Sequence, residues 1–235
     1  MKRNNRTIID YNTWERRDNF EFFKEFVNPC YSVTCDVECT SAFENSKREK
    51  SSFFLKYLYS ILRAVNEIPE LRYRIENQEC IEDEGTRQCK EEIIVLYEKV
   101  SAITPIAVGT NGKFHSVNIP YIESFGEFSQ KAEEIIGSIP KETNPYAAEK
   151  SARDGVSNSM DMVLIAANPG LAFTSMTCTQ SSKYGNRKPL INVGKATKRE
   201  GRYYIPIFIS VHHGLCDGYH LTHFYNLIEK YLGEL

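Results

Sequence analysis

Apolar residues recur with helical spacing in four stretches of the chain. These are residues 14–26, 51–66, 128–136 and 219–232. In the last stretch the apolar positions form one stripe, as expected for a helix with one buried face. Pro29 and Pro69 mark the ends of the first two stretches, because a proline disfavours helix at the residue before it. The pattern therefore predicts four helices.

The pattern changes to alternation or to short apolar runs where strands are expected. Odd-numbered residues from Tyr31 to Cys39 alternate with polar ones, which predicts a strand with one buried face. Residues 203–211 are almost continuously apolar, which favours burial on both faces. Pro206 within that run indicates that one side lacks a complete partner strand. Other short strands are expected at 72–75, 93–100, 115–119 and 162–167.

The remaining segments are predicted to be turns and loops. Residues 79–92 are charged and contain Gly85, which indicates a turn or hairpin. Residues 140–159 and 177–188 are rich in small and polar residues, and we expect long loops there. Helices and strands alternate irregularly and no internal repeat is visible. We therefore expect one α/β domain, residues 1–235, with a mixed β-sheet flanked by helices.

Composition narrows the function classes. The chain has 29 Lys and Arg against 31 Asp and Glu, and the resulting net charge of −2 argues against a general nucleic-acid binder. No apolar run approaches the roughly 18 residues that a membrane span requires, and no apolar signal segment follows Met1. The seven cysteines include no C-x-x-C pair, which fits reduced thiols and not a zinc ribbon. We expect a cytoplasmic protein that contacts neither nucleic acid nor membrane.

The richest candidate chemistry follows the apolar run at 203–211. Four of the five histidines fall between His212 and His223. A histidine here suits a general base, because its ordinary pKa is near neutrality. His213, Asp217 and His220 also have the right side chains for a metal site, but their spacing matches no standard zinc pattern. From the residues alone, ordinary structural histidines remain a third alternative.

The segment His213-x-x-x-Asp217-Gly218 carries the H-x-x-x-D-G signature of CoA-dependent acyltransferases. With the preceding His212 and the following Tyr219-His220, it resembles the chloramphenicol acetyltransferase family. Residues 14–23 resemble the W-x-R-R-x-x-F-E-F block of that family, and Pro29-Cys30 follows at the expected distance. Residues 64–72 resemble a third block, so the resemblance spans nearly the whole chain.

The resemblance implies a fold, an assembly and a mechanism. The expected fold is the α/β chloramphenicol acetyltransferase fold, and the expected assembly is a homotrimer with active sites at subunit interfaces. His213 would be the general base, and acetyl-CoA would be the co-substrate, with no metal. Asp217 would pair with Arg16 in an ion pair that shapes the site. The residues expected near a small-molecule acceptor are Phe22, Phe23, Cys30 and Tyr31.

The chain departs from the family pattern at several positions. The family carries a serine that helps to stabilise the oxyanion of the reaction, and here Ala166 takes its place. Asn192 occupies a position that is usually threonine, and Phe23 one that is often tyrosine. Because removing one oxyanion donor lowers rates about 100- to 1000-fold, Asn192, Thr174, Ser175 or a water would have to compensate in part.

Three functions are therefore considered. The first is acetyl-CoA-dependent O-acetylation of chloramphenicol, which inactivates the antibiotic. The second keeps the chemistry but changes the hydroxyl acceptor, and it is motivated by Ala166 and Phe23. The third is a non-enzymatic small-molecule or CoA binder on the same trimeric scaffold. The presence of His213, Asp217 and Arg16 speaks against the third, because a binder needs no base.

Overall fold

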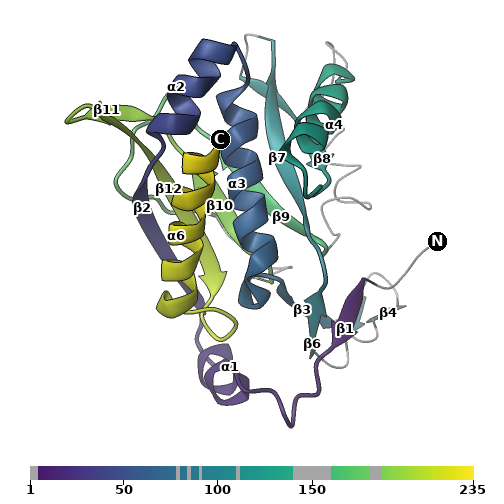
Figure 1. The fold of residues 1–235 in the computed structure, drawn as a ribbon. Coiled ribbons are helices and arrows are strands. Elements are labelled where there is room, and N and C mark those ends of the chain that lie inside the picture. The colour runs from purple at the N-terminus through teal and green to yellow at the C-terminus, as the bar shows by residue number, and fades with distance from the viewer. Residues whose placement is uncertain are drawn as a thin grey trace.

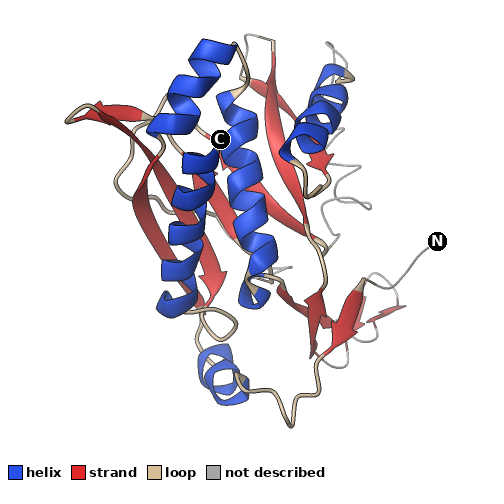
Figure 2. Ribbon diagram, in the orientation of Figure 1, coloured by secondary structure: helices blue, strands red, loops and turns tan. Residues whose placement is uncertain are grey.

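The computed structural model describes residues 5–77, 80–83, 86–89, 92–109, 112–139, 160–179 and 187–235. Helices lie together on one face of a large mixed sheet (Figures 1 and 2). This sheet has the order β11-β12-β10-β9-β7-β8, and β2 pairs with the other edge of β12. Its strands are β2 (Cys30–Glu38), β7 (Ser101–Val108), β8 (Lys113–Ile119), β9 (Met162–Ala167), β10 (Leu190–Val193), β11 (Thr197–Arg199) and β12 (Arg202–His212). The pairs β7–β9 and β9–β10 are parallel and the others antiparallel, as a mixed sheet requires.

In the part of the chain that the structure describes, five helices cover or extend this sheet. Three have apolar stripes that predict them well: α3 (Phe53–Glu67), α4 (Phe125–Gly137) and α6 (Gly218–Glu234). Ser52 caps α3 by accepting a hydrogen bond from the backbone N of Leu55 at 3.3 Å, which satisfies one of its free amides. The other two are α1 (Arg17–Lys24) and α2 (Thr40–Glu49). The helices α2, α3 and α6 pack side by side in front of β2 and β12 (Figure 1).

A smaller layer lies beside the main sheet. It consists of β1 (Arg6–Ile8), β6 (Glu92–Tyr97) and β3 (Tyr73–Asn77), and η1 (Pro69–Leu71) joins α3 to it. The hairpin β4 (Cys80–Asp83) and β5 (Thr86–Cys89) continues from β3 and β6 and confirms the hairpin predicted at 79–92. Trp14 and Phe20 pack with Tyr73 and Leu215 in a small apolar cluster that joins this layer to the main sheet.

The core follows the alternation of the strands. Residues of β12 such as Ile205, Ile207 and Ile209 face the helices and join one large apolar cluster with α3 and α6. On the opposite face, Pro206 and Phe208 are also buried, which confirms the predicted two-sided burial of this run. Pro206 falls between the residues that pair with β10 and those that pair with β11, so the ladder on that side is interrupted as predicted.

Some expectations from the pattern are wrong in detail. The first helix spans only Arg17–Lys24, and of its phenylalanines only Phe20 is buried, whereas Phe22 is 62% exposed. The helix α2 was not predicted, because its ten residues include few apolar positions and it buries only Ala42 and Ser46. The strand β7 was also missed because it contains Pro105. That residue pairs only with β8, beyond the three residues that pair with β9.

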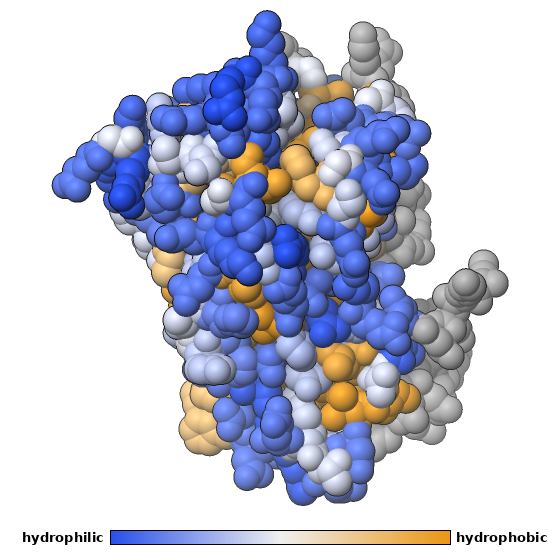
Figure 3. Space-filling model, in the orientation of Figure 1, coloured by the Kyte–Doolittle hydropathy of each residue, from blue (hydrophilic) through white to orange (hydrophobic). Residues whose placement is uncertain are grey.

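Two further expectations concern loops and membranes. The predicted loop at 140–159 lies outside the described residues. In the described part of the chain, no helix is long and apolar enough to cross a membrane. The molecular face in Figure 3 is largely hydrophilic, with hydrophobic residues in separate patches.

Candidate active site

The candidate site begins where β12 ends and α6 starts. β12 stops at His212, and a tight turn follows in which the backbone N of Leu215 and that of Cys216 both donate to the carbonyl of His212. Asp217 then caps α6, and its Oδ1 accepts a hydrogen bond from the backbone N of Tyr219 at 3.1 Å. The aspartate therefore serves both as a helix cap and as a charged group beside the turn.

His213 lies in this turn with its ring between aromatic neighbours. The ring stacks on Phe23 at a centroid distance of 4.0 Å and on Tyr31 at 4.6 Å, with interplanar angles of 10° and 24°. Its backbone N donates to the carbonyl of Pro29 at 2.8 Å. Nδ1 is buried without a hydrogen-bond partner among the described residues. The two aromatic rings therefore restrict the orientation of the imidazole, and of its two nitrogens only Nδ1 is buried without a partner.

Arg16 and Asp217 connect the turn to the start of α1. Arg16 Nη1 lies 3.1 Å from Asp217 Oδ2, and Arg16 Nε donates to the carbonyl of Gly214 at 3.3 Å. Arg16 is only 8% exposed. Burial raises the pKa of Asp217, but His220 and Arg16 lower it by more, so the carboxyl has a pKa below its usual value. The pair therefore ties the backbone beside His213 to α1 through charged hydrogen bonds.

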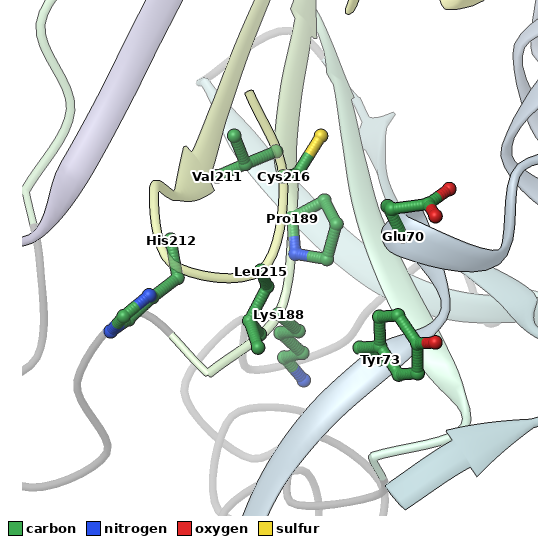
Figure 4. Close-up of a pocket in the computed structure, with 8 residues that line it drawn as sticks. All are labelled: Glu70, Tyr73, Lys188, Pro189, Val211, His212, Leu215 and Cys216. Atoms are coloured by element: carbon green, nitrogen blue, oxygen red, sulfur yellow. The ribbon is translucent and has the colours of Figure 1, made fainter. Parts of the chain in front are cut away.

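His212, next in sequence, is a buried structural residue. Its Nδ1 accepts a hydrogen bond from the backbone N of Gly214 at 3.1 Å, and its ring stacks near Phe20. Burial and the neighbouring His213 lower its pKa to about 4. Figure 4 shows His212 at the edge of a small cavity, with Glu70 and Tyr73 on the opposite side. A neutral, buried imidazole at this point supports the turn and is unsuited to take up a proton.

The predicted acceptor-side residues gather around the same turn. Cys30 is opposite His212 in the β2–β12 register, and Tyr31 is opposite Val211. Phe23 and Tyr31 contact His213 directly, as described above. Phe22 packs edge-to-face against Phe23 and is largely exposed. The structure therefore brings Phe23, Cys30 and Tyr31 to the turn and leaves Phe22 at the surface.

The residues predicted for oxyanion binding lie elsewhere on the sheet. Ala166 of β9 is directly beside Asn192 of β10 in their parallel register. Asn192 is 6% exposed; its Oδ1 accepts from Asn168 Nδ2 at 3.2 Å, and its Nδ2 lies 3.5 Å from Cys178 Sγ. Thr174 and Ser175 are exposed in the loop that follows β9. Asn168 and Cys178 were not singled out from the sequence, because only the fold brings them to Asn192.

These two groups of residues are far apart within one chain. Asn192 pairs with Phe208 of β12, and β12 ends four residues later at His212. At the usual rise of a strand, four residues span about 13 Å. One chain therefore presents the His213 turn at one end of the sheet and the Ala166–Asn192 pair away from that end.

The metal alternative finds no matching geometry. In the residues that the structure describes, no group of three or more His, Cys, Asp or Glu side chains is arranged to hold a metal ion. His220 contacts Asp217, whereas His213 stacks on aromatic rings. Glu70 Oε1 lies 3.6 Å from His220 Nε2. Glu70 belongs to the family block at residues 64–72, and its place in that block is the sequence signal that could have identified it.

The comparisons with known proteins agree on one family. The family model described as chloramphenicol acetyltransferase matches residues 4–229. A chloramphenicol acetyltransferase of Clostridium butyricum is 28% identical over 96% of this chain and 94% of its own, and one of Proteus mirabilis is 24% identical over 97% and 94%. A solved structure described as chloramphenicol acetyltransferase is 44% identical, with a TM-score of 0.83, over 97% of this chain and 99% of that one.

A more distant likeness shows the wider fold. The catalytic core of a 2-oxoacid dehydrogenase complex from Thermoplasma acidophilum has a TM-score of 0.55 at 18% identity, over 92% of this chain and 91% of that one. At this identity the likeness concerns the fold alone. It agrees with the predicted mixed sheet flanked by helices.

Proposed function

The chain belongs to the chloramphenicol acetyltransferase family and is an acyltransferase, and we propose that it moves the acetyl group of acetyl-CoA to a hydroxyl of chloramphenicol. The observation that carries this proposal is the orientation of His213. Its ring is held by Phe23 and Tyr31, and its Nδ1 is buried, so one nitrogen remains for an incoming hydroxyl.

In the proposed reaction His213 is the general base. Nε2 takes the proton of the acceptor hydroxyl while the hydroxyl oxygen attacks the carbonyl carbon of the thioester. A tetrahedral intermediate forms with a negative oxygen. It collapses by breaking the carbon–sulfur bond, and the imidazolium returns the proton to the sulfur of CoA. The products are the acetyl ester and free CoA, and no acyl-enzyme forms.

Asp217 and Arg16 have a structural role in this proposal. Arg16 bonds to both the carboxylate of Asp217 and the carbonyl of Gly214, which adjoins His213. Because both groups are charged and Arg16 is buried, their bonds resist displacement of the turn more strongly than neutral ones. The acceptor would lie against Phe23, Cys30 and Tyr31, with Phe22 at the rim.

We further propose that the complete site lies between subunits of a homotrimer. Oxyanion donors act only within hydrogen-bond distance of the reacting oxygen, and about 13 Å of strand separates the Asn192–Phe208 pair from the end of β12, before the His213 turn, within one chain. A neighbouring subunit can bring its own Asn192 end to the His213 turn. This arrangement is supported by the register and by the exposed Phe22 and Val27 near the turn.

The oxyanion is proposed to be stabilised in the region of Ala166 and Asn192. Ala166 has no donor, but the amide nitrogen of Asn192 has two N–H groups, and only one can point at the sulfur of Cys178. The contact from Asn168 to Asn192 Oδ1 fixes which end of the amide is the donor. Thr174 and Ser175 remain alternative donors in the exposed loop after β9.

A second acceptor is favoured by specific residues. Phe23 has no hydroxyl with which to bond a polar acceptor, and Ala166 leaves an apolar surface where the family has a serine. Both changes lower the polarity of the site. A hydroxyl compound less polar than chloramphenicol is therefore the alternative substrate for the same reaction.

The direct experiment follows CoA thiol release from acetyl-CoA in the presence of chloramphenicol. Release without acceptor is subtracted, and His213→Ala is measured in parallel. Acceptor-dependent release that falls by about 100-fold or more in the variant supports the proposal, since a general base contributes roughly 100- to 10000-fold. Turnover of another hydroxyl compound, but not of chloramphenicol, would replace the proposed substrate. Binding of chloramphenicol without turnover of any acceptor would favour a binding role.

A further inference from the structure

A line of four charged or titratable side chains runs from η1 to α1 beneath the His213 turn. Glu70 Oε1 is 3.6 Å from His220 Nε2, and His220 Nδ1 is 2.8 Å from Asp217 Oδ1. Asp217 Oδ2 is in turn 3.1 Å from Arg16 Nη1. The side chains of Glu70 and His220 are both 14% exposed. The first of these side chains, Glu70, belongs to η1, which contains none of the residues proposed to contact a substrate.

The line is tied to the start of α6 by a capping box. His220 Nδ1 accepts a hydrogen bond from the backbone N of Asp217 at 3.3 Å, while Asp217 accepts from the first turn of the helix. Glu70 lies beside the other ring nitrogen, Nε2. The imidazole is therefore held between the helix cap and Glu70, so a change at Glu70 reaches Asp217 through the ring.

The line reaches the reacting histidine through the backbone. Arg16 Nε bonds to the carbonyl of Gly214, the residue directly after His213. Gly214 has little freedom to move, because a Cβ there would lie 2.8 Å from the Cα of Phe20. A displacement of Asp217 would therefore move Arg16, and Arg16 would in turn strain its hydrogen bond to the closely packed backbone at Gly214. Glu70 acts on Asp217 only through His220.

We infer that Glu70 and His220 are positioning residues for the proposed acetyl transfer, and that they set the orientation of His213 through Asp217 and Arg16. This inference rests on the proposed function for its kinetic test. The inference predicts that replacing Glu70 lowers the rate of the chemical step. Glu70 is linked to the His213 turn only through His220, Asp217 and Arg16, and it is not among the residues proposed to contact a substrate.

The test compares Glu70→Gln and His220→Asn with a matched control, Glu67→Gln. Glu67 is three residues earlier in the chain and contacts Arg63 and Tyr231, away from the site. We expect kcat to fall about tenfold in each of the first two variants, since each removes a polar contact of His220 on the route to Asp217. KM should change less than twofold, and the control should keep the kcat of the unmodified protein.

A double variant separates positioning from general loss of stability. Arg16 and His220 contact Asp217, the thiol of Cys216 adjoins it in the chain, and Glu70 lies on the far side of His220. If Glu70 acts through Asp217, then Glu70→Gln should cause no additional loss of kcat in the Asp217→Asn background. A further loss of kcat in that background would mean that Glu70 acts by another route.

A measurement without substrate keeps the inference separate from the proposed function. The ring resonances of His213 are assigned in histidine-labelled protein with His213→Gln and followed by NMR in each variant. Glu70→Gln should shift them and Glu67→Gln should not. Unchanged resonances together with an unchanged kcat in Glu70→Gln would overturn the inference. If no acceptor is turned over at all, the proposed function fails, while the NMR comparison still decides the positioning.

Discussion

The two ends of the central strands carry different chemistry. At the end of β12, charged side chains hold the turn, and Arg16, Asp217 and His220 are linked by short contacts. At the end of β9 and β10, Ala166 is joined by neutral groups, namely the amides of Asn168 and Asn192 and the thiol of Cys178. The proposed base must be held in one orientation, and here aromatic rings contact it while charged side chains hold its turn. An oxyanion needs only dipoles that point at it, and several neutral donors can supply them.

The largest test of this comparison mixes two inactive variants. His213→Ala removes the base at one end, and Ala166→Trp fills the other end with a bulky ring. Each variant alone should be inactive if both ends contribute to one site. If sites form between subunits, trimers assembled from an equal mixture should recover up to about one quarter of full activity, because half of the subunits retain each intact end.

The measurement is CoA release after the two variants are unfolded and refolded together. Separately refolded samples that are mixed afterwards serve as the control. Recovery in the co-refolded sample alone supports a shared site. If co-refolded trimers stay inactive, both ends either act within one chain or do not act together.

The next effect concerns the buried histidine of the turn. The pKa of His212 is lowered to about 4 in the folded protein, against an ordinary value near 6.5. The unfolded chain therefore binds the extra proton between these values, and stability is lost as the pH falls from about 6.5 to about 4. The loss attributable to His212 is of the order of 3 kcal/mol.

Urea unfolding at several pH values checks this expectation. His212→Asn retains an acceptor near the backbone N of Gly214 but cannot titrate, so its stability should depend less on pH in this window. His223→Asn, at an exposed position of α6, should follow the unmodified protein. Equal pH dependence in all three proteins would contradict the assignment.

The Ala166 end predicts a gain of function. Ala166→Ser restores a hydroxyl beside Asn192, and we expect kcat to rise about tenfold, which is less than the 100-fold or greater effect of a sole oxyanion donor. The smaller figure follows from the amide already present at Asn192. Steady-state kinetics with a saturating acceptor give the answer. An unchanged kcat would mean that the donor is supplied elsewhere.

The smallest expected effect tests the packing of the turn. Gly214→Ala places a Cβ 2.8 Å from the Cα of Phe20, and overpacking of this kind destabilises by roughly 1 to 3 kcal/mol. Gly233 has open space at the same position, so Gly233→Ala should be neutral or stabilise α6 by up to about 1 kcal/mol. Thermal or urea unfolding of the two variants measures the difference. Equal stability would show that the turn can relax.

The predicted and observed helices and strands differ in how well the local sequence pattern identifies them. The stripe of α6 and the continuous run of β12 are decided by local periodicity, and both elements appear within one or two residues of the prediction. The helix α2 and the strand β7 have weak local signals, and their places are decided by packing against α6 and by pairing with β8. Phe22 illustrates the same limit, because the local pattern places it in a helix but does not show that its side chain is exposed in the fold.

The sequence by itself determined the strand–turn–helix junction and its candidate base, because these depend on residues that are close along the chain. The resemblance added the partner of Asp217, which lies 201 positions away at Arg16. Only the tertiary structure decided that Glu70 lies beside His220 and that Asn192 pairs with β12 about 13 Å of strand before its end at His212. Contacts of this kind are fixed by strand register and helix packing, which join distant residues and leave no periodic trace in the sequence.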